Sequence, residues 1–284
     1  MNLVQELRLL KRWFSKTEIA RRKLYKVIGD FLPDDPIILE GGAYRGEDSV
    51  RMSKYWPMGR IHAFEPVPAL FEHLKKNTSK FSNISIYPYA LGDKVGSAKM
   101  NVSSGKSDAS SSLLTPKDHL LYHPDVFFEK KEHVQCITIE HWMLKSGIKK
   151  IDFLWLDLQG MELKVLRQKE KCLHQTKVIY TEVNFKKNYE EADLFDDLRA
   201  WLEDRQFQLF FLDKDGDDAG NALFVKADKQ LLPIKYEKFR FKNFYYMFNS
   251  NSKRSMDIRK VPVMCKFVGR SYNYLRSKFR RQFT

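Results

Sequence analysis

The segment Glu40-Gly41-Gly42-Ala43-Tyr44-Arg45-Gly46 combines an acid with three glycines. It follows the short apolar run Ile37 to Leu39 and precedes residues that can form a helix. Glycine has no Cβ, so a glycine-rich backbone can approach a ligand closely. The free N–H groups at the start of a helix bind anionic groups. The pattern is typical of a loop that holds a cofactor at the carboxyl end of a central parallel strand.

The glycine spacing separates two classes of cofactor. A dinucleotide-binding loop has the spacing G-x-G-x-x-G, whereas the glycines here are residues 41, 42 and 46. Glu40 would repel a pyrophosphate, but it would attract the ammonium group of S-adenosyl-L-methionine. A second acid, Glu65, ends the next apolar segment and can accept hydrogen bonds from both hydroxyls of a ribose. We therefore expect S-adenosyl-L-methionine; the alternative is a tight turn in which Glu40 is a capping acid.

Apolar segments with the spacing of strands and helices alternate between residues 37 and 225, as in βα units. Expected helices cover residues 1–32, 47–55, 68–77, 162–173 and 193–204. Expected strands cover residues 37–39, 60–64, 84–88, 151–158 and 178–183, followed by a closing antiparallel pair, 207–212 and 222–225. The pattern predicts a doubly wound, Rossmann-like α/β fold with a seven-stranded, mostly parallel sheet, an N-terminal helix and a basic C-terminal extension.

Residues 95–135 interrupt this alternation. They contain a hairpin signal at residues 97–102, a serine-rich stretch at residues 103–112, and a polar connection that includes His119, His123 and His133. Long connections of this kind are often functional. We expect an insertion or lid over the site.

The sequence resembles the FkbM family of methyltransferases over about residues 37–226. The family pattern acid-x-G-A-x-x-G matches residues 40–46, its aromatic-Glu-Pro motif matches Phe64-Glu65-Pro66, and its Ala-Leu-Gly-Asp motif matches residues 90–93. Residues 151–166 match I-D-x-L-K-I-D-V-E-G-x-E-x-x-V-L, and Ser111-Ser112-Leu113 and residues 137–139 also lie where the family has similar residues. The resemblance implies a class I methyltransferase fold. It implies that the methyl donor contacts Glu40, Gly42, Ala43, Tyr44, Gly46, Glu65, Pro66, Ala90 and Leu91, with Ala90 and Leu91 beside the adenine.

Two residues depart from the family pattern. Trp155 replaces a usual lysine, and Gln159 replaces a usual glutamate, near the strand end that should face the transferred methyl group. The resemblance implies O-methylation of a hydroxyl on a saccharide or small metabolite, and these departures leave the acceptor open. We expect Trp155 and Met161 to be core residues rather than parts of a cofactor site.

Methyl transfer to a hydroxyl needs alignment, which can contribute about 7–11 kcal/mol, and a base that accepts the hydroxyl proton. The candidate catalytic residues are Asp157, Gln159 and Glu182, at the ends of two expected strands. Asp157 and Glu182 could instead cap neighbouring helices. Ser111 and Ser112 could bind a hydroxylated substrate, although the serine-rich stretch could equally be a flexible loop.

The remaining polar residues give weaker signals. A histidine base is a weaker alternative to the two acids. No spacing matches a known metal-binding motif, so we expect no metal. The three cysteines are far apart and form no CxxC pair, which favours reduced thiols in the cytoplasm. We find neither a signal peptide nor a transmembrane stretch.

The positive charge is concentrated at the C-terminal end. Residues 229–284 contain 15 of the 50 Lys and Arg residues and two acids, so this segment carries +13 of the net charge of +14. Aromatic residues lie between the bases, and residues 261–281 could form an amphipathic helix. This mixture suits an anionic membrane surface or glycolipid, packing on the catalytic domain, or, less strongly, single-stranded nucleic acid.

We divide the chain into an N-terminal helical segment (1–36), a methyltransferase domain (37–228) and the basic extension (229–284). The favoured function is S-adenosyl-L-methionine-dependent O-methylation of a small hydroxylated molecule or glycan. One alternative is a non-catalytic binding module that acts through its basic tail, and another is a nucleic-acid methyltransferase. We expect a cytoplasmic protein that can also lie peripherally at a membrane surface.

Overall fold

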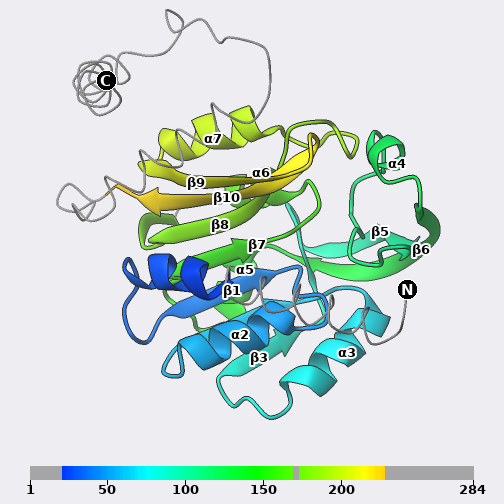
Figure 1. Cartoon of the computed structure of the whole chain (residues 1–284). Helices are drawn as coiled ribbons and strands as arrows, with labels where there is room; N and C mark the ends of the chain where they lie inside the picture. The colour runs from blue at the N-terminus through cyan, green and yellow to red at the C-terminus, as the bar shows by residue number, and fades with distance from the viewer. Residues whose placement is uncertain (1–20, 169–172, 228–284) are drawn as a thin grey trace, which may run out of the picture. The chain divides into compact units, whose positions relative to one another are not determined.

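The computed structural model of the chain describes residues 21–168 and 173–227 (Figure 1). Residues 21–29 are helical, as predicted. The first part of the predicted N-terminal helix and the whole basic extension, residues 229–284, lie outside the described residues. No helix within the described ranges is long and apolar enough to cross a membrane.

Seven strands form the main sheet, in the order β3-β2-β1-β7-β8-β10-β9. The pairs from β3 to β8 are parallel, whereas β10 is antiparallel to both of its neighbours. This arrangement confirms the predicted doubly wound, mostly parallel sheet. The strands are β1 (Ile37–Gly41), β2 (Arg60–Phe64), β3 (Ile84–Tyr87), β7 (Phe153–Leu156), β8 (Val178–Asn184), β9 (Phe207–Asp215) and β10 (Ala219–Lys226).

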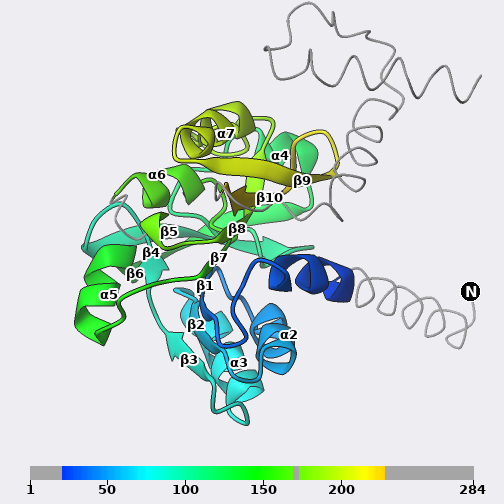
Figure 2. The ribbon, with the colours of Figure 1, turned by 90° about the vertical axis from the view of Figure 1, so that its left-hand side faces the viewer.

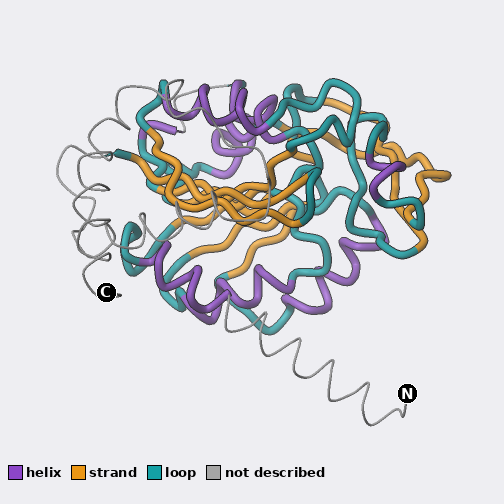
Figure 3. The backbone as a smooth tube through the Cα atoms, turned by 45° about the horizontal axis from the view of Figure 1, so that its top comes forward, coloured by secondary structure: helices purple, strands orange, loops and turns teal. Residues whose placement is uncertain are grey.

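Helices cover both faces of this sheet, as Figures 2 and 3 show. On one face lie the helical residues 21–29, α2 (Glu47–Tyr55) and α3 (Pro68–Thr78). On the other lie α5 (Ile139–Ser146), α6 (Glu162–Arg167) and α7 (Phe195–Glu203). Because the central strands β1 and β7 are covered on both faces, all their residues are buried, which explains why Glu40 is the one charged residue in the two strands.

The order of the strands creates a switch point between β1 and β7. From β1 the chain proceeds outward to β2 and β3, and it later returns to place β7 on the other side of β1. In such sheets, ligands bind outside the carboxyl ends of the strands at this point. The loops after β1 and β7 therefore meet where a ligand site is expected.

A second sheet corrects our interpretation of residues 95–135. Its strands are β4 (Ala90–Leu91), β5 (Gly96–Gly105) and β6 (Val126–Ile137), in the order β4-β6-β5, and α4 (His119–Tyr122) lies in the connection. The hairpin is thus longer than predicted, and its second strand occupies part of the expected polar connection. The strand was missed because half of its side chains are exposed and several are charged, so its sequence resembles a polar loop.

The helical residues 21–29 pack directly on the sheet domain. The ring of Tyr25 lies 5.6 Å from that of Tyr55, 5.5 Å from that of Trp56 and 6.0 Å from that of Trp155. Tyr25 is buried, and its hydroxyl donates to Asp48 in α2 (3.1 Å). This segment therefore forms part of the wall next to the carboxyl end of β1.

Candidate functional site

A cavity of about 240 Å³ lies at the carboxyl ends of β1, β2 and β7. Predicted residues from all three strand ends line it together. They include eight of the nine residues expected to hold a cofactor: Glu40, Gly42, Ala43, Tyr44, Glu65, Pro66, Ala90 and Leu91. Ser111, Asp157 and Gln159 line the same cavity. Trp155 and Met161 are buried, as expected of core residues, but they also line the cavity, so the expectation that they lie apart from the site is wrong.

The glycines of the first loop are required by contacts within the protein. Gly42 has a φ of 76°, and a Cβ at this position would lie 1.9 Å from the backbone oxygen of Asp157. Gly46 has a φ of 86° at the N-cap of α2, where a Cβ would lie 2.7 Å from Leu74 in α3. Gly46 is not among the residues that line the cavity. It serves the turn and the packing of α2 on α3, which corrects its predicted role as a ligand contact.

Glu65 is fixed by the backbone at the end of β2. One carboxylate oxygen accepts a hydrogen bond from the N–H of Tyr44, and the other accepts one from the N–H of Val67, both at 2.9 Å. Burial raises the pKa of Glu65 to about 7, against the effect of these two bonds. The side chain therefore presents its oxygens to the cavity in one orientation.

Glu40, near the end of β1, is also buried. The hydroxyl of Ser49 in α2 donates to its carboxylate. Burial, together with the nearby charges of Asp48 and Glu47, raises the pKa of Glu40 to about 8, against the effect of the hydrogen bond from Ser49. A cationic group of a ligand would favour its charged form, so this position is suited to an ammonium.

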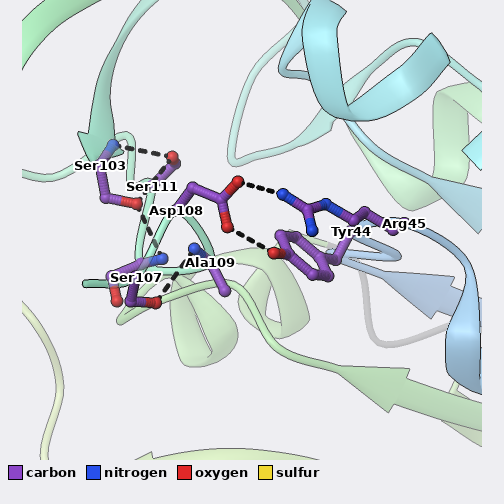
Figure 4. A network of polar contacts seen from close by, with 8 residues as sticks. Tyr44, Arg45, Ser103, Ser107, Asp108, Ala109 and Ser111 are labelled. Carbon is purple, nitrogen blue, oxygen red and sulfur yellow. Dashed lines mark hydrogen bonds and ion pairs between the residues drawn. The ribbon is translucent and has the colours of Figure 1, made fainter. Parts of the chain in front are cut away.

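The loop between β5 and α4 contributes residues to the cavity lining, and polar contacts join it to the loop after β1 (Figure 4). Asp108 in this loop accepts hydrogen bonds from the hydroxyl of Tyr44 and from the guanidinium of Arg45, the latter at 2.5 Å. Tyr44 has a φ of 53°, which is unusual for a residue with a Cβ. The inserted segment is thus fastened to the loop after β1, as expected for a lid.

The serines of this loop mainly stabilise the loop itself. The Oγ of Ser111 accepts a hydrogen bond from the N–H of Ser103 (3.0 Å), as Figure 4 shows, although Ser111 also lines the cavity. Ser112 is fully buried and donates to the backbone oxygen of Gln159 (2.8 Å). This position corrects the prediction that Ser112 contacts a substrate, because its hydroxyl joins the lid to the loop after β7.

The three candidate catalytic residues form one hydrogen-bonded group. The side-chain amide of Gln159 donates to Asp157 (2.7 Å) and to Glu182 (2.8 Å). The hydroxyl of Tyr189 lies 2.7 Å from the amide oxygen of Gln159 and 2.9 Å from the backbone oxygen of Ser110. Tyr189 was not predicted, because it lies in a polar loop far from the motifs and only the fold brings it to Gln159.

The two acids have linked protonation. Burial raises the pKa of Glu182 well above its usual value, and the charges of Asp157 and Glu162 raise it further. Burial also raises the pKa of Asp157, although hydrogen bonds from Gln159 and Glu182 oppose the shift. A hydrogen bond between the two carboxyl groups adds to the rise in the pKa of Glu182 and opposes the rise in the pKa of Asp157. Protein atoms surround Asp157 closely enough to raise its pKa, yet its side chain is open to solvent on the cavity side, whereas Glu182 does not line the cavity.

Glu162, at the start of α6, holds the loop that carries this group. Its carboxylate accepts hydrogen bonds from the N–H groups of Leu158 (2.7 Å) and Gly160 (3.0 Å). Gln159, between them, has a φ of 51°. Since a positive φ costs about 1 kcal/mol or more in a residue with a Cβ, these bonds offset the strain that aims the Gln159 side chain at the acids.

The histidines do not lie at the cavity. His119 is buried in α4, where burial lowers its pKa to about 4, and His123 lies 3.2 Å from Asp218. His133 is exposed on β6. None of the three is among the residues that line the cavity. Among the residues that the structure describes, no group of three or more His, Cys, Asp or Glu side chains is placed to hold a metal ion.

Comparisons with known proteins agree with the sequence motifs. Residues 40–209 match the family described as the Methyltransferase FkbM domain. The 2-O-methyltransferase NoeI of Sinorhizobium fredii is 27% identical over 195 residues, which cover 67% of this chain and 80% of that protein. Methyltransferase sdnD of Sordaria araneosa is 24% identical, over 63% of this chain and 76% of its own length. Among solved structures, the methyltransferase FkbM from Methylobacillus flagellatus KT matches with a TM-score of 0.45 and 14% identity, over 68% of this chain and 44% of that chain.

Proposed function

Since the family match spans more than half of its residues, the chain belongs to the FkbM methyltransferase domain family, and we propose that it transfers a methyl group from S-adenosyl-L-methionine to a hydroxyl of a saccharide or small metabolite. The observation that carries the proposal is the placement of Asp157, with its raised pKa, in the same cavity as Glu40 and Glu65.

The cavity has the groups that this methyl donor requires. When bound, S-adenosyl-L-methionine supplies an electrophilic methyl group on a sulfonium centre. Glu40 suits the ammonium group, and the backbone-held carboxylate of Glu65 suits the two hydroxyls of a ribose. Ala90 and Leu91, both buried, offer an apolar wall for a flat base.

We assign the role of general base to Asp157. A base is most effective when its pKa lies near the working pH, and burial shifts the pKa of Asp157 in this direction. Asp157 would accept the proton of the acceptor hydroxyl, while Glu182 keeps its own proton and the hydrogen bond to Asp157. Glu182 and Gln159 act as positioning residues, since neither needs to touch the acceptor.

The glutamine at position 159 is compatible with an active enzyme and does not indicate a lost active site. A side-chain amide has two N–H donors and one oxygen acceptor, and all three engage the site, with Asp157, Glu182 and Tyr189. A glutamate at this position would add a third carboxylate to an acidic pair. The departure from the family pattern therefore argues against the non-catalytic alternative.

The name of one relative supports an oxygen atom as the methyl acceptor. The printed name of the Sinorhizobium fredii protein describes a 2-O-methyltransferase, and hydroxyl methylation uses a base such as Asp157. No observation on the described residues favours a nucleic-acid acceptor.

The test is a tritiated-methyl assay with S-adenosyl-L-methionine on fractionated cell extract. We expect label in a carbohydrate or small-metabolite fraction, and loss of that label with the variant Asp157→Asn. A matched control is Glu72→Gln, because Glu72 is exposed on α3 and does not line the cavity. Label confined to nucleic acid or protein would overturn the acceptor class, and failure of the intact protein to bind S-adenosylhomocysteine would overturn the proposed function.

A further inference from the structure

Acidic side chains greatly outnumber basic ones in the lining of the cavity. Among the described side chains that line it there is one cation, Arg21, in the helical residues 21–29. Six acids line the same cavity: Glu40, Glu47, Asp48, Glu65, Asp108 and Asp157. An anionic group that enters this cavity therefore has one cationic side chain to bind.

The proposed methyl donor carries such a group. Its methionyl part ends in an ammonium and an α-carboxylate, and Glu40 suits only the ammonium. A carboxylate that is removed from water among acids is costly unless it is paired. The planar guanidinium of arginine matches a carboxylate in shape and can donate two parallel hydrogen bonds to it.

Arg21 is held on the side of the cavity where Glu40 lies. Its guanidinium lies 4.8 Å from the centre of the Trp155 ring, in β7, and 3.3 Å from the carboxylate of Asp48, in α2. Trp155 is the strand partner of Glu40, so Arg21 lies over the strand next to that acid. The charge of Arg21 also acts on both Glu40 and Asp157, where it opposes the raising of their pKa values by burial.

The guanidinium of Arg21 has N–H groups that can still donate hydrogen bonds to a ligand. A guanidinium has five N–H groups, and its contacts with Asp48 and Tyr180 do not use all of them. Trp155 adds a cation–π contact, which fixes the plane of the guanidinium without using an N–H group. The side chain is thus positioned before a ligand arrives.

We propose that Arg21 binds the α-carboxylate of the methyl donor, opposite Glu40 at the ammonium. This inference rests on the proposed function. It also explains a departure from the family pattern: Trp155 stands where a lysine is usual, and here it supports a cation that comes from the helix before β1. The helical residues 21–29 are then part of the donor site.

The experiment compares two ligands by isothermal titration on the full chain. S-Adenosyl-L-methionine carries the α-carboxylate, whereas decarboxylated S-adenosyl-L-methionine keeps the ammonium, sulfonium and adenosine but lacks it. For Arg21→Met, which keeps an apolar side chain over Trp155, we expect about a tenfold or greater loss of affinity for the first ligand. For the decarboxylated ligand we expect a change of less than about twofold, because it has no carboxylate for Arg21 to bind.

Arg51→Met is the matched control. Arg51 also pairs with Asp48 (3.1 Å), but it does not line the cavity, so both affinities should stay unchanged.

An equal loss for both ligands with Arg21→Met, or no loss, would overturn the proposal. If Arg21→Met lowers the melting temperature, Arg21→Lys provides the second measurement, because it retains a charge and should recover selectivity for the carboxylated ligand. Failure of the intact protein to bind either ligand would instead contradict the proposed function.

Discussion

The acids at the end of β2 and those at the ends of β7 and β8 are held in different ways. Glu65 is fixed by backbone N–H groups of neighbouring loop residues, whereas Asp157 and Glu182 are held by the side chain of Gln159, which in turn contacts Tyr189. Backbone groups give one fixed orientation, which suits binding. A side-chain network lets two acids share a proton, which suits catalysis. The comparison shows that an acid held by backbone groups and a pair of acids joined through side chains lie in different parts of one site.

The largest effect should come from Asp157→Asn. The asparagine oxygen can still accept from Gln159, but it cannot take up a proton, so we expect kcat to fall by about 10²–10⁴-fold. Affinity for S-adenosylhomocysteine should change less than about threefold, because the donor side is held independently. Single-turnover kinetics and titration calorimetry measure the two quantities. Equal losses of kcat and affinity would contradict the separation of the two parts.

Glu65→Ala should show the opposite pattern. The substitution removes a carboxylate suited to two ribose hydroxyls, and each hydrogen bond to a charged group contributes about 1.5–3 kcal/mol. We expect about a 100-fold loss of affinity for S-adenosylhomocysteine, measured by calorimetry. Glu72→Ala, on the exposed face of α3, is the control and should bind as the unsubstituted protein does. An affinity that is unchanged in Glu65→Ala would remove this residue from the donor site.

Gln159→Glu tests the acidic pair. The new carboxylate cannot donate to Asp157 or Glu182, and its charge would raise the pKa values of both. We expect about a tenfold fall in kcat at neutral pH, with recovery as the pH is raised. The pH profile of kcat is the measurement, and Gln168→Glu, on an exposed residue outside the cavity, is its control. A fall in kcat without a shift of the profile would mean that Gln159 acts only through packing.

The smallest expected effect is on stability. The pKa values of Glu40, Glu65 and Glu162 are raised from 4.5 to about 8, 7 and 8, respectively. Between pH 4.5 and 8 the unfolded chain therefore binds fewer protons than the folded chain, so stability falls as the pH rises through this window.

Glu40→Gln should reduce this slope and stabilise the free protein at pH 8, by on the order of 2 kcal/mol. It should also weaken donor binding, since an amide does not attract an ammonium. Thermal melts from pH 5 to 8, with and without S-adenosylhomocysteine, measure both effects. The interpretation fails if the slopes of Glu40→Gln and the unsubstituted protein are the same.

Much of the main sheet was predictable, because its signals are local. The helix 47–55 and the strand 60–64 were predicted with their observed bounds. The second sheet was not predictable in full, since half of the residues of β6 are exposed and its polar sequence resembles a loop. Helix α6 is also shorter than predicted: it ends at Arg167.

The sequence by itself determined the parallel sheet, the loop after β1 and the acids at the ends of β1 and β2, because each depends on the order of neighbouring residues. Only the tertiary structure decided that Gly46 serves helix packing and that Ser112 fastens the lid. It also decided which side chains complete the cavity, as Arg21 and Tyr189 reach their partners from distant segments. Contacts between side chains far apart in the chain form only when the fold brings these segments together. They leave no local pattern in the sequence from which they could be predicted.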